Sequence, residues 1–301
     1  MDSAAGAASA GRWESHQRAF EAYLRGLTFS DERRLAGLVE AMRYAMLAGG
    51  KRVRPTLCME CAWVFGADPE RVLPSAAAIE LIHTYSLIHD DLPAMDDDDY
   101  RRGQPTTHKK YGEAMAILAG DAFFGEALTL ITVHQKGTCE QAVEVVRELA
   151  DSTGVAGMVG GQVMDMDHTG VGAGTDPETL FMIHKYKTGA LIKSSARIGA
   201  ILAGVGEEEQ AAISEYASEL GLCFQIVDDV LNATATTAEL GKSAGSDAEQ
   251  GKATFVGVFG LEGARQEADA SVERALAALE RVHGETSGLR EMALFVRHRE
   301  S

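Results

Sequence analysis

Proline is scarce in this sequence of 301 residues: there are six in all, and Pro177 alone follows Pro105. Because proline breaks helices, a long stretch with one proline that is rich in alanine, leucine and glutamate favours helix. Apolar residues recur at helical spacing through 113–133 and 208–231, and no alternating strand pattern is bounded by turn signals. We therefore predict an all-α chain without a sheet, forming one large bundle of about ten to twelve helices.

Cysteine is also rare, with four residues in the chain. Cys58 and Cys61 form a C-x-x-C pair, but they lie in an apolar, helix-like segment where packing is the simpler role. No second cysteine or histidine pair stands at zinc spacing. A disulfide framework and a zinc site are therefore not expected, and a reducing cytoplasm is the predicted location.

Basic residues are outnumbered, with 28 lysines and arginines against 45 acidic residues and a net charge of −17. This balance argues against a nucleic-acid partner, which requires a basic surface. No uncharged apolar run reaches the length of about 18 residues that a membrane span needs. The start, MDSAAGAASAG, lacks the basic segment and apolar core of a secretory signal. We expect residues 1–12 to be a disordered terminus and 13–301 to form a single domain.

What the sequence does hold is an acidic run, HDDLPAMDDDDYRRG, at 89–103. Its six aspartates would repel one another unless a cation lies among them, although a solvated acidic loop is the simpler alternative. His83 and Asp90 are seven residues apart and share a helical face. Asp96 would lie about 240° from Asp90 on an unbroken helix. The two carboxylates can therefore converge only if the segment around Pro93 bulges out of the helix.

A second acidic group interrupts the apolar run FQIVDDVLN, where Asp228, Asp229 and Asn232 are predicted to line one helical face. Two adjacent buried carboxylates are unfavourable unless they are paired or bind metal. A structural ion pair is the alternative. Carboxylates are hard ligands that suit Mg²⁺, which is commonly completed by substrate phosphate.

Basic clusters stand at breaks beside these helices and could hold phosphate groups, although each alone would be read as surface charge. They are Lys51, Arg52 and Arg54; Arg101 and Arg102; Lys185 and Lys187; and Lys242. Together with the two acidic groups they predict a diphosphate–metal site between helices.

The chain resembles the trans-isoprenyl diphosphate synthases, and within that family it is most similar to the bacterial farnesyl and plant-type geranylgeranyl diphosphate synthases. The resemblance runs from about residue 40 to the end and rests on five segments in the order and spacing of that family. They are LAGGKRVRP, the acidic run with its continuation to GDA, GMVGGQVMD, KYKTGAL and FQIVDDVLNATATTAELGKSAGSD.

The resemblance implies an isoprenoid synthase-like helical bundle with a central diphosphate–metal cavity, a homodimer, and condensation of isopentenyl diphosphate with an allylic diphosphate. It implies Mg²⁺, in three ions, with Mn²⁺ as a substitute. The implied metal ligands are Asp90, Asp96 and Asp228, and the implied catalytic group adds Asp91, Asp229 and Lys187. The implied allylic contacts are Arg101, Lys187, Thr188, Gln225 and Lys242. The implied isopentenyl diphosphate contacts are Lys51, Arg54, His83 and Arg102, with Lys252 on the phosphate side.

Product length is predicted from Tyr85 and Ser86, which precede Asp90 by about one helical turn. In the family a bulky residue here is associated with C15 products, so farnesyl diphosphate is expected and the C20 geranylgeranyl product is the alternative. The sequence departs from the family at Asn232, where aspartate is usual. Because of this departure, a weakly active or regulatory homologue remains a further alternative. A class I terpene cyclase on the same fold is another.

Overall fold

The computed structural model describes residues 2–234 and 251–299 and is a bundle of helices, as the proline-poor sequence predicts. The elements are α1 (Asp2–Gly26), η1 (Arg33–Leu35), α2 (Ala36–Met46), α3 (Val53–Val64), η2 (Pro69–Val72), α4 (Leu73–Asp90), β1 (Tyr100–Arg101), β2 (Gln104–Pro105), α5 (Thr107–Tyr111), α6 (Glu113–Thr129), η3 (Leu130–His134), α7 (Cys139–Thr153), α8 (Met158–His168), η4 (Gly172–Gly174), α9 (Pro177–His184), η5 (Lys185–Gly189), α10 (Ala190–Ala203), α11 (Glu207–Thr234), α14 (Phe255–Ala278), η6 (Leu279–Arg281) and α15 (Ser287–His298).

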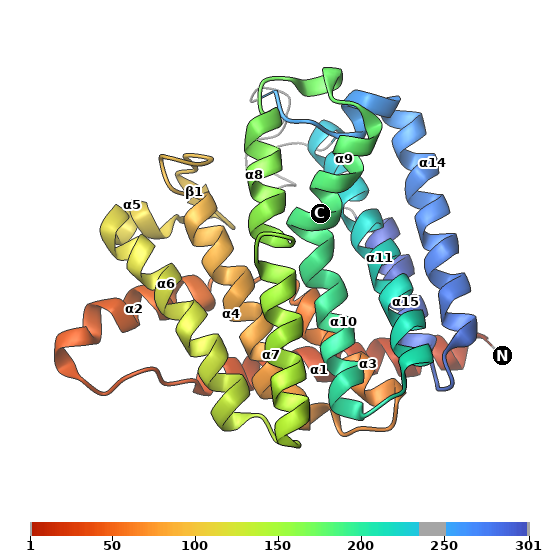
Figure 1. The fold of residues 1–301 in the computed structure, drawn as a ribbon, viewed down its shortest axis with the longest axis horizontal. Helices are drawn as coiled ribbons and strands as arrows, with labels where there is room; N and C mark the ends of the chain where they lie inside the picture. Colours follow the sequence, from red (N-terminus) through yellow and green to blue (C-terminus); the bar gives the residue numbers. More distant parts are fainter. Residues whose placement is uncertain (1, 235–250, 300–301) are drawn as a thin grey trace.

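Two apolar clusters build the core. One surrounds α4 and contains Phe20, Ile82 and Phe123; the other surrounds α11 and contains Tyr216 and Phe255. α4 is buried over most of its length because its alanine-rich face lets neighbouring helices approach closely. In Figure 1 α4 and α11 both run upward, so their C-terminal ends lie in the upper half of the bundle. This arrangement places both acidic groups toward the same end.

The prediction of no sheet is wrong in one small detail. β1 and β2 form a two-stranded antiparallel ladder with Arg101 opposite Gln104. The two central residues of the turn, Arg102 and Gly103, have φ values of 53° and 74°, as a two-residue hairpin turn requires. Strands of two residues are too short to produce an alternating pattern, so the sequence carried no detectable signal.

The first helix begins close to the N-terminus. α1 extends from Asp2 to Gly26 without a break, and its first part is rich in alanine, the residue with the highest helix propensity. The division of the chain into a disordered segment 1–12 and a domain 13–301 stays a prediction.

One described helical stretch, Glu113–His134, is long and apolar enough by composition to cross a membrane. It carries Asp121 and Glu126 in its middle, and its inner side, with Ala119 and Phe123, is packed in the core cluster around α4. A core helix passes the same test of length and composition, so the stretch is weak evidence for a membrane span.

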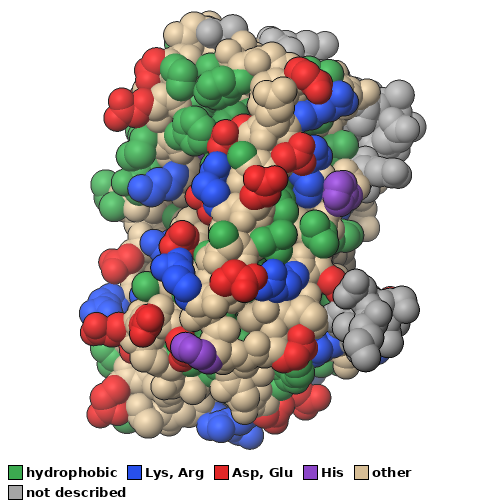
Figure 2. All heavy atoms as spheres, turned by 90° about the vertical axis from the view of Figure 1, so that its right-hand side faces the viewer, with side chains coloured by type: hydrophobic (Ala, Val, Ile, Leu, Met, Phe, Trp, Pro, Cys, Tyr) green, Lys and Arg blue, Asp and Glu red, His purple; other side chains and the backbone are tan. Residues whose placement is uncertain are grey.

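The excess negative charge is not gathered on the face formed by α14 and its neighbours. Figure 2 shows acidic and basic side chains intermingled there. Arg274 bonds to both Glu219 and Glu267, at 2.9 and 2.8 Å, and Arg297 pairs with Asp269 at 2.5 Å. Exposed pairs of this kind contribute little to stability. Because they balance one another, this face has no electrostatic potential of one predominant sign.

Candidate active site

The end of α4 brings the first acidic group together. The chain leaves the helix after Asp90, and the amide of Asp96 returns to donate a hydrogen bond to the carbonyl of Asp90 at 2.9 Å. The amides of Met95 and Asp97 bond to the carbonyl of Leu92, which closes the same turn. The bulge around Pro93 that the sequence required is therefore present, and it removes the phase difference between the two aspartates.

The pKa of Asp90 is raised from 3.8 to about 6, because burial raises it more than the Lys187 charge lowers it, and the Asp96 carboxylate adds to the rise. Desolvation and a like charge both disfavour the ionised form of a carboxyl group. An acid in this state gains stabilisation from any cation that binds beside it. We therefore expect the first acidic group to favour binding of a cation.

Two lysines flank this group. The ammonium of Lys252 lies 3.1 Å from Asp96, and that of Lys187 lies 2.5 Å from Asp165 on α8. Burial lowers the pKa of Lys187, but the charges of Asp165 and Asp90 outweigh it and raise that pKa overall. The Lys187 ammonium therefore remains positively charged next to Asp90. There it can neutralise an anion that is released during a reaction.

Neighbouring arginines of the β1–β2 hairpin point to different partners. Arg101 bonds to the buried carboxylate of Asp91 through Nε at 2.8 Å and through a terminal nitrogen at 2.6 Å. Arg102 donates to the carbonyl of Gly49. Gly50 has a φ of 134°, which residues with a Cβ rarely adopt, so glycine suits this loop, and the Arg102 guanidinium lies 2.8 Å from where its Cβ would be. Asp91 therefore orients Arg101, and Arg102 reaches the loop before α3.

Arg54 and His83 meet between α3 and α4. Arg54 lies 3.4 Å from Nε2 of His83, and its own Nε is buried with no hydrogen-bond partner in the described residues. Burial, and then the charge of Arg54, holds the pKa of His83 well below its usual value. Burial also lowers the pKa of Arg54, while Asp228 raises it. An unsatisfied buried cationic donor is unfavourable without an acceptor, which fits a site for an anion.

Arg52 does not belong with these cations, although the sequence placed it in the same cluster. Its side chain is 2% exposed and bonds to Glu21 at 2.7 Å and to Glu80 at 2.6 Å. Arg52 ties α1 and α4 together at the start of α3. Lys51, the preceding residue, is exposed, so only Lys51 and Arg54 of this cluster are free to contact a ligand.

The second acidic group divides into two roles. Asp228 has a side chain that is 44% exposed and pairs with Arg299, whose terminal nitrogen lies 2.5 Å from Oδ1. Asp229 is buried and faces another way: it accepts a hydrogen bond from the Phe255 amide at 2.8 Å and from the Gln225 side chain at 3.0 Å. Asp229 therefore fixes the start of α14, whereas Asp228 is the carboxylate that can reach a ligand.

Thr188 and Gln225 are joined to the same network. The Thr188 hydroxyl donates to Oε1 of Gln225 at 2.8 Å, so η5, α11 and α14 are linked through these side chains. Asn232 lies within α11 and is 5% exposed. Lys242, expected at the allylic diphosphate, lies outside the described residues.

The residues predicted to set product length lie on α4. Tyr85 is half-buried and packs edge-to-face against Phe124 of α6, with ring centroids 6.3 Å apart. Burial raises its pKa to about 12. The Ser86 hydroxyl donates to the carbonyl of His83 at 2.9 Å and is therefore already satisfied within its own helix. Of the two, Tyr85 supplies the bulk.

The donor set fits magnesium. Asp90, Asp96 and Asp228 offer carboxylate oxygens, which Mg²⁺ prefers together with water and phosphate. Burial, with a smaller contribution from the Asp96 charge, raises the pKa of Asp90, and a divalent ion would stabilise its ionised form. A separate group next to the hairpin, Asp97, Asp99 and His108, also brings ligand atoms within 4.8 Å of one another. Asp99 of that group is paired with Lys109 at 2.6 Å, just as Asp96 is paired with Lys252 and Asp228 with Arg299.

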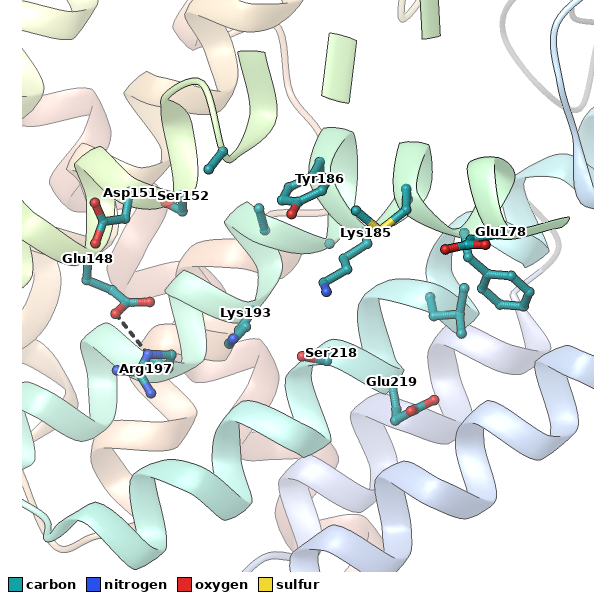
Figure 3. Close-up of a pocket in the computed structure, with 16 residues that line it drawn as sticks. Glu148, Asp151, Ser152, Glu178, Lys185, Tyr186, Lys193, Arg197, Ser218 and Glu219 are labelled. Carbon is teal, nitrogen blue, oxygen red and sulfur yellow. Dashed lines mark ion pairs between the residues drawn. The ribbon is translucent and has the colours of Figure 1, made fainter. Parts of the chain in front are cut away.

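A cavity of about 800 Å³ lies on the outer side of this region, between α7, α9, α10 and α11. Figure 3 shows Lys185 and Lys193 pointing into it and Glu148 paired with Arg197, at 2.8 Å. None of the residues lining it belongs to either acidic group. The π-helical turn η5 separates the two spaces, because Lys185 lines the cavity while Lys187 contacts Asp165.

Two charged residues in the site had no role assigned from the sequence. Asp165 is the buried acid in the segment GQVMD. Its apolar neighbours Val163, Met164 and Met166 could have indicated a functional or paired carboxylate, because an acid is rarely buried without a partner. Arg299 bonds to a residue 71 positions earlier in the chain. No local pattern could have predicted that contact.

The polyprenyl synthetase family matches residues 36–287 of this chain. The chain is 45% identical over 239 residues to geranylgeranyl diphosphate synthase of Cyanophora paradoxa, covering 79% of each protein. It is 43% identical over 265 residues to farnesyl diphosphate synthase of Escherichia coli, covering 86% of this chain and 88% of that protein. The crystal structure of a geranyltransferase from Helicobacter pylori, complexed with magnesium and isoprenyl diphosphate, has a TM-score of 0.85 at 30% identity and covers 96% of both chains.

Proposed function

The chain belongs to the polyprenyl synthetase family, and we propose that it condenses isopentenyl diphosphate head-to-tail with dimethylallyl or geranyl diphosphate to give farnesyl diphosphate. It is a short-chain polyprenyl diphosphate synthase. The observation that carries the assignment of the site is the turn that joins Asp96 to Asp90 beside Lys187 and Lys252. This turn supports a site in which two carboxylates and two ammonium groups act on one bound anion.

The allylic diphosphate binds at this first acidic group. Asp90, Asp96 and Asp228 would hold Mg²⁺, which would supply positive charge to stabilise the leaving diphosphate. Lys187, Lys252 and Arg101 supply fixed positive charge at the same anion, and fixed charge in a site that excludes water needs no reorganisation during the reaction. These groups favour cleavage of the allylic C–O bond.

Isopentenyl diphosphate binds on the other side, at Lys51, Arg54 and Arg102. The buried Nε of Arg54 gains the acceptor that it lacks, and neutral His83 keeps Arg54 in place. The double bond of isopentenyl diphosphate then attacks the allylic carbon, and proton loss completes the new prenyl chain. A cluster of cations separate from the Asp90 group favours a two-diphosphate condensation over a terpene cyclase, which ionises one diphosphate alone.

Farnesyl diphosphate is the proposed main product because Tyr85 narrows the space below Asp90. The hydrocarbon tail needs an apolar path, and an aromatic ring packed against Phe124 closes such a path early. Relatives of similar identity make either the C15 or the C20 product by name, so geranylgeranyl diphosphate is the competing product. The cytoplasmic location and the number of metal ions stay predictions.

A homodimer is the proposed assembly. α6 exposes Ile117, Leu118 and Phe124, whose exposed fractions are 44%, 55% and 42%. On α8, Val163 and Met166 are exposed by 52% and 46%. Exposed apolar side chains on α6 and α8 support this proposal, because a second copy of the chain would cover them. Light scattering on the purified chain tests this, and a monomer at micromolar concentration would overturn it.

The function is tested by incubating the protein with isopentenyl diphosphate, Mg²⁺ and each allylic primer, followed by analysis of product length. We expect a C15 product from dimethylallyl and geranyl diphosphate, and no product after chelation of the metal. A main product of C20 would overturn the proposed length but not the reaction. Consumption of an allylic diphosphate without isopentenyl diphosphate, to give a hydrocarbon, would indicate a cyclase.

A further inference from the structure

The residue that follows α15, Arg299, is held tightly against the turn of α11 that carries Asp228. One terminal nitrogen donates to Oδ1 of Asp228 at 2.5 Å and to the carbonyl of Phe224 at 2.6 Å. The guanidinium also lies over the Phe224 ring, 3.8 Å from its centroid. The Arg299 side chain is 3% exposed. A charge buried to this degree is normally fixed by a specific partner, and here that partner is Asp228.

This contact places a positive charge where the proposed function requires a divalent cation. A metal ion at Asp228 would stand a few ångströms from a desolvated guanidinium, and like charges repel most strongly where water is excluded. The two cations also compete for the same electron pairs, because Oδ1 accepts from Arg299 at 2.5 Å. Lys51 belongs to the same neighbourhood: burial and then the Arg299 charge lower its pKa, while the Asp228 charge raises it.

We propose that Arg299 is a positioning residue that competes with the metal for Asp228. Without metal, Arg299 neutralises Asp228 and holds its carboxylate toward the C-terminal end of the chain. With metal bound at Asp228, the guanidinium of Arg299 would give up its hydrogen bond to Oδ1. Metal affinity at the second acidic group is thus reduced by the C-terminal arginine, while affinity at Asp90 and Asp96 is not. The inference rests on the proposed assignment of Asp228 as a metal ligand.

The test is a titration of the full chain with Mn²⁺ alone, in which electron paramagnetic resonance measures the free ion. We expect Arg299→Gln to bind the Asp228-dependent Mn²⁺ about tenfold more tightly than wild type, the ratio that corresponds to roughly 1.4 kcal/mol at 25 °C. Arg297→Gln is the matched control, because Arg297 lies on α15 and pairs with Asp269 instead. That control should leave the affinity unchanged.

Asp228→Asn separates this inference from the assignment on which it rests. If Asp228→Asn loses a Mn²⁺ site but Arg299→Gln shows equal or weaker binding, competition by Arg299 is refuted and the metal assignment stands. If Asp228→Asn leaves Mn²⁺ binding unchanged, the assignment of Asp228 is refuted, and the inference with it. Should Arg299→Gln fail to fold by circular dichroism, Arg299→Met removes the charge while keeping an unbranched side chain against Phe224, and no gain in affinity in that variant refutes the proposal.

Discussion

Replacing Asp90 with asparagine should make the metal-free protein more stable while it abolishes activity. The Asp90 pKa rises from 3.8 to about 6 on folding, mainly through burial. A shift of about two units corresponds to roughly 3 kcal/mol, and because Asp90 keeps partial contact with solvent we expect roughly 1–3 kcal/mol. Asparagine is close to aspartate in shape and removes the charge that burial disfavours.

The pH dependence of this gain has a definite sign. The folded state holds the Asp90 proton more tightly than the unfolded state, so the ionised carboxylate destabilises the fold. The destabilisation is absent well below pH 3.8, develops up to about pH 6 and is complete above it. Asp90→Asn should therefore raise the free energy of unfolding fully at pH 8 and by about half as much at pH 5.

Urea denaturation at pH 8 and pH 5, without metal, measures the effect. Asp31→Asn is the control, because Asp31 is exposed in a loop and its replacement should change little. Mg²⁺ with inorganic diphosphate should stabilise wild type but not Asp90→Asn, since only wild type can bind both. An Asp90→Asn variant that is less stable than wild type at pH 8 would show that the carboxylate is favourably paired and that our electrostatic reasoning fails.

Three further outcomes are expected. Lys187→Ala should lower kcat about 100-fold with the fold intact by circular dichroism, because it removes the cation beside Asp90; a change in KM alone would contradict this. Asp229→Asn should lower the urea-derived free energy of unfolding by about 1–3 kcal/mol, since the Phe255 amide loses a charged acceptor, and full stability would exclude the structural role. Tyr85→Ala should shift products to C20 or longer in a chain-length assay, and an unchanged product length would locate the tunnel floor elsewhere.

The helical fold and the outline of the site could be predicted because both depend on local patterns. Few prolines and a helical apolar period indicate a bundle whatever the tertiary contacts are. The acidic run also indicated its own geometry, since Pro93 between Asp90 and Asp96 required a bulge. The hydrogen bond from the Asp96 amide to the Asp90 carbonyl closes this bulge, as expected.

The rest depended on contacts between distant segments, which one sequence does not encode in a readable form. Adjacent aspartates at 228 and 229 were expected to act together, yet a helix rotates successive side chains by about 100°, and only Asp229 faces the start of α14. Likewise, Arg52 and Arg54 are two residues apart, but Arg52 is committed to Glu21 and Glu80. The sequence identified the charged residues, and tertiary packing decided which of them are available.

The β1–β2 hairpin has a consequence for how this region can change in evolution. Exposed loops usually accept insertions and deletions, and this hairpin lies at the surface. Its turn, however, sends Arg101 to Asp91 and Arg102 to the loop at Gly49. One residue added or lost between Tyr100 and Gln104 would shift the register, so that Arg101 and Arg102 could no longer both reach these partners. We therefore expect functional relatives to keep the length of this hairpin constant.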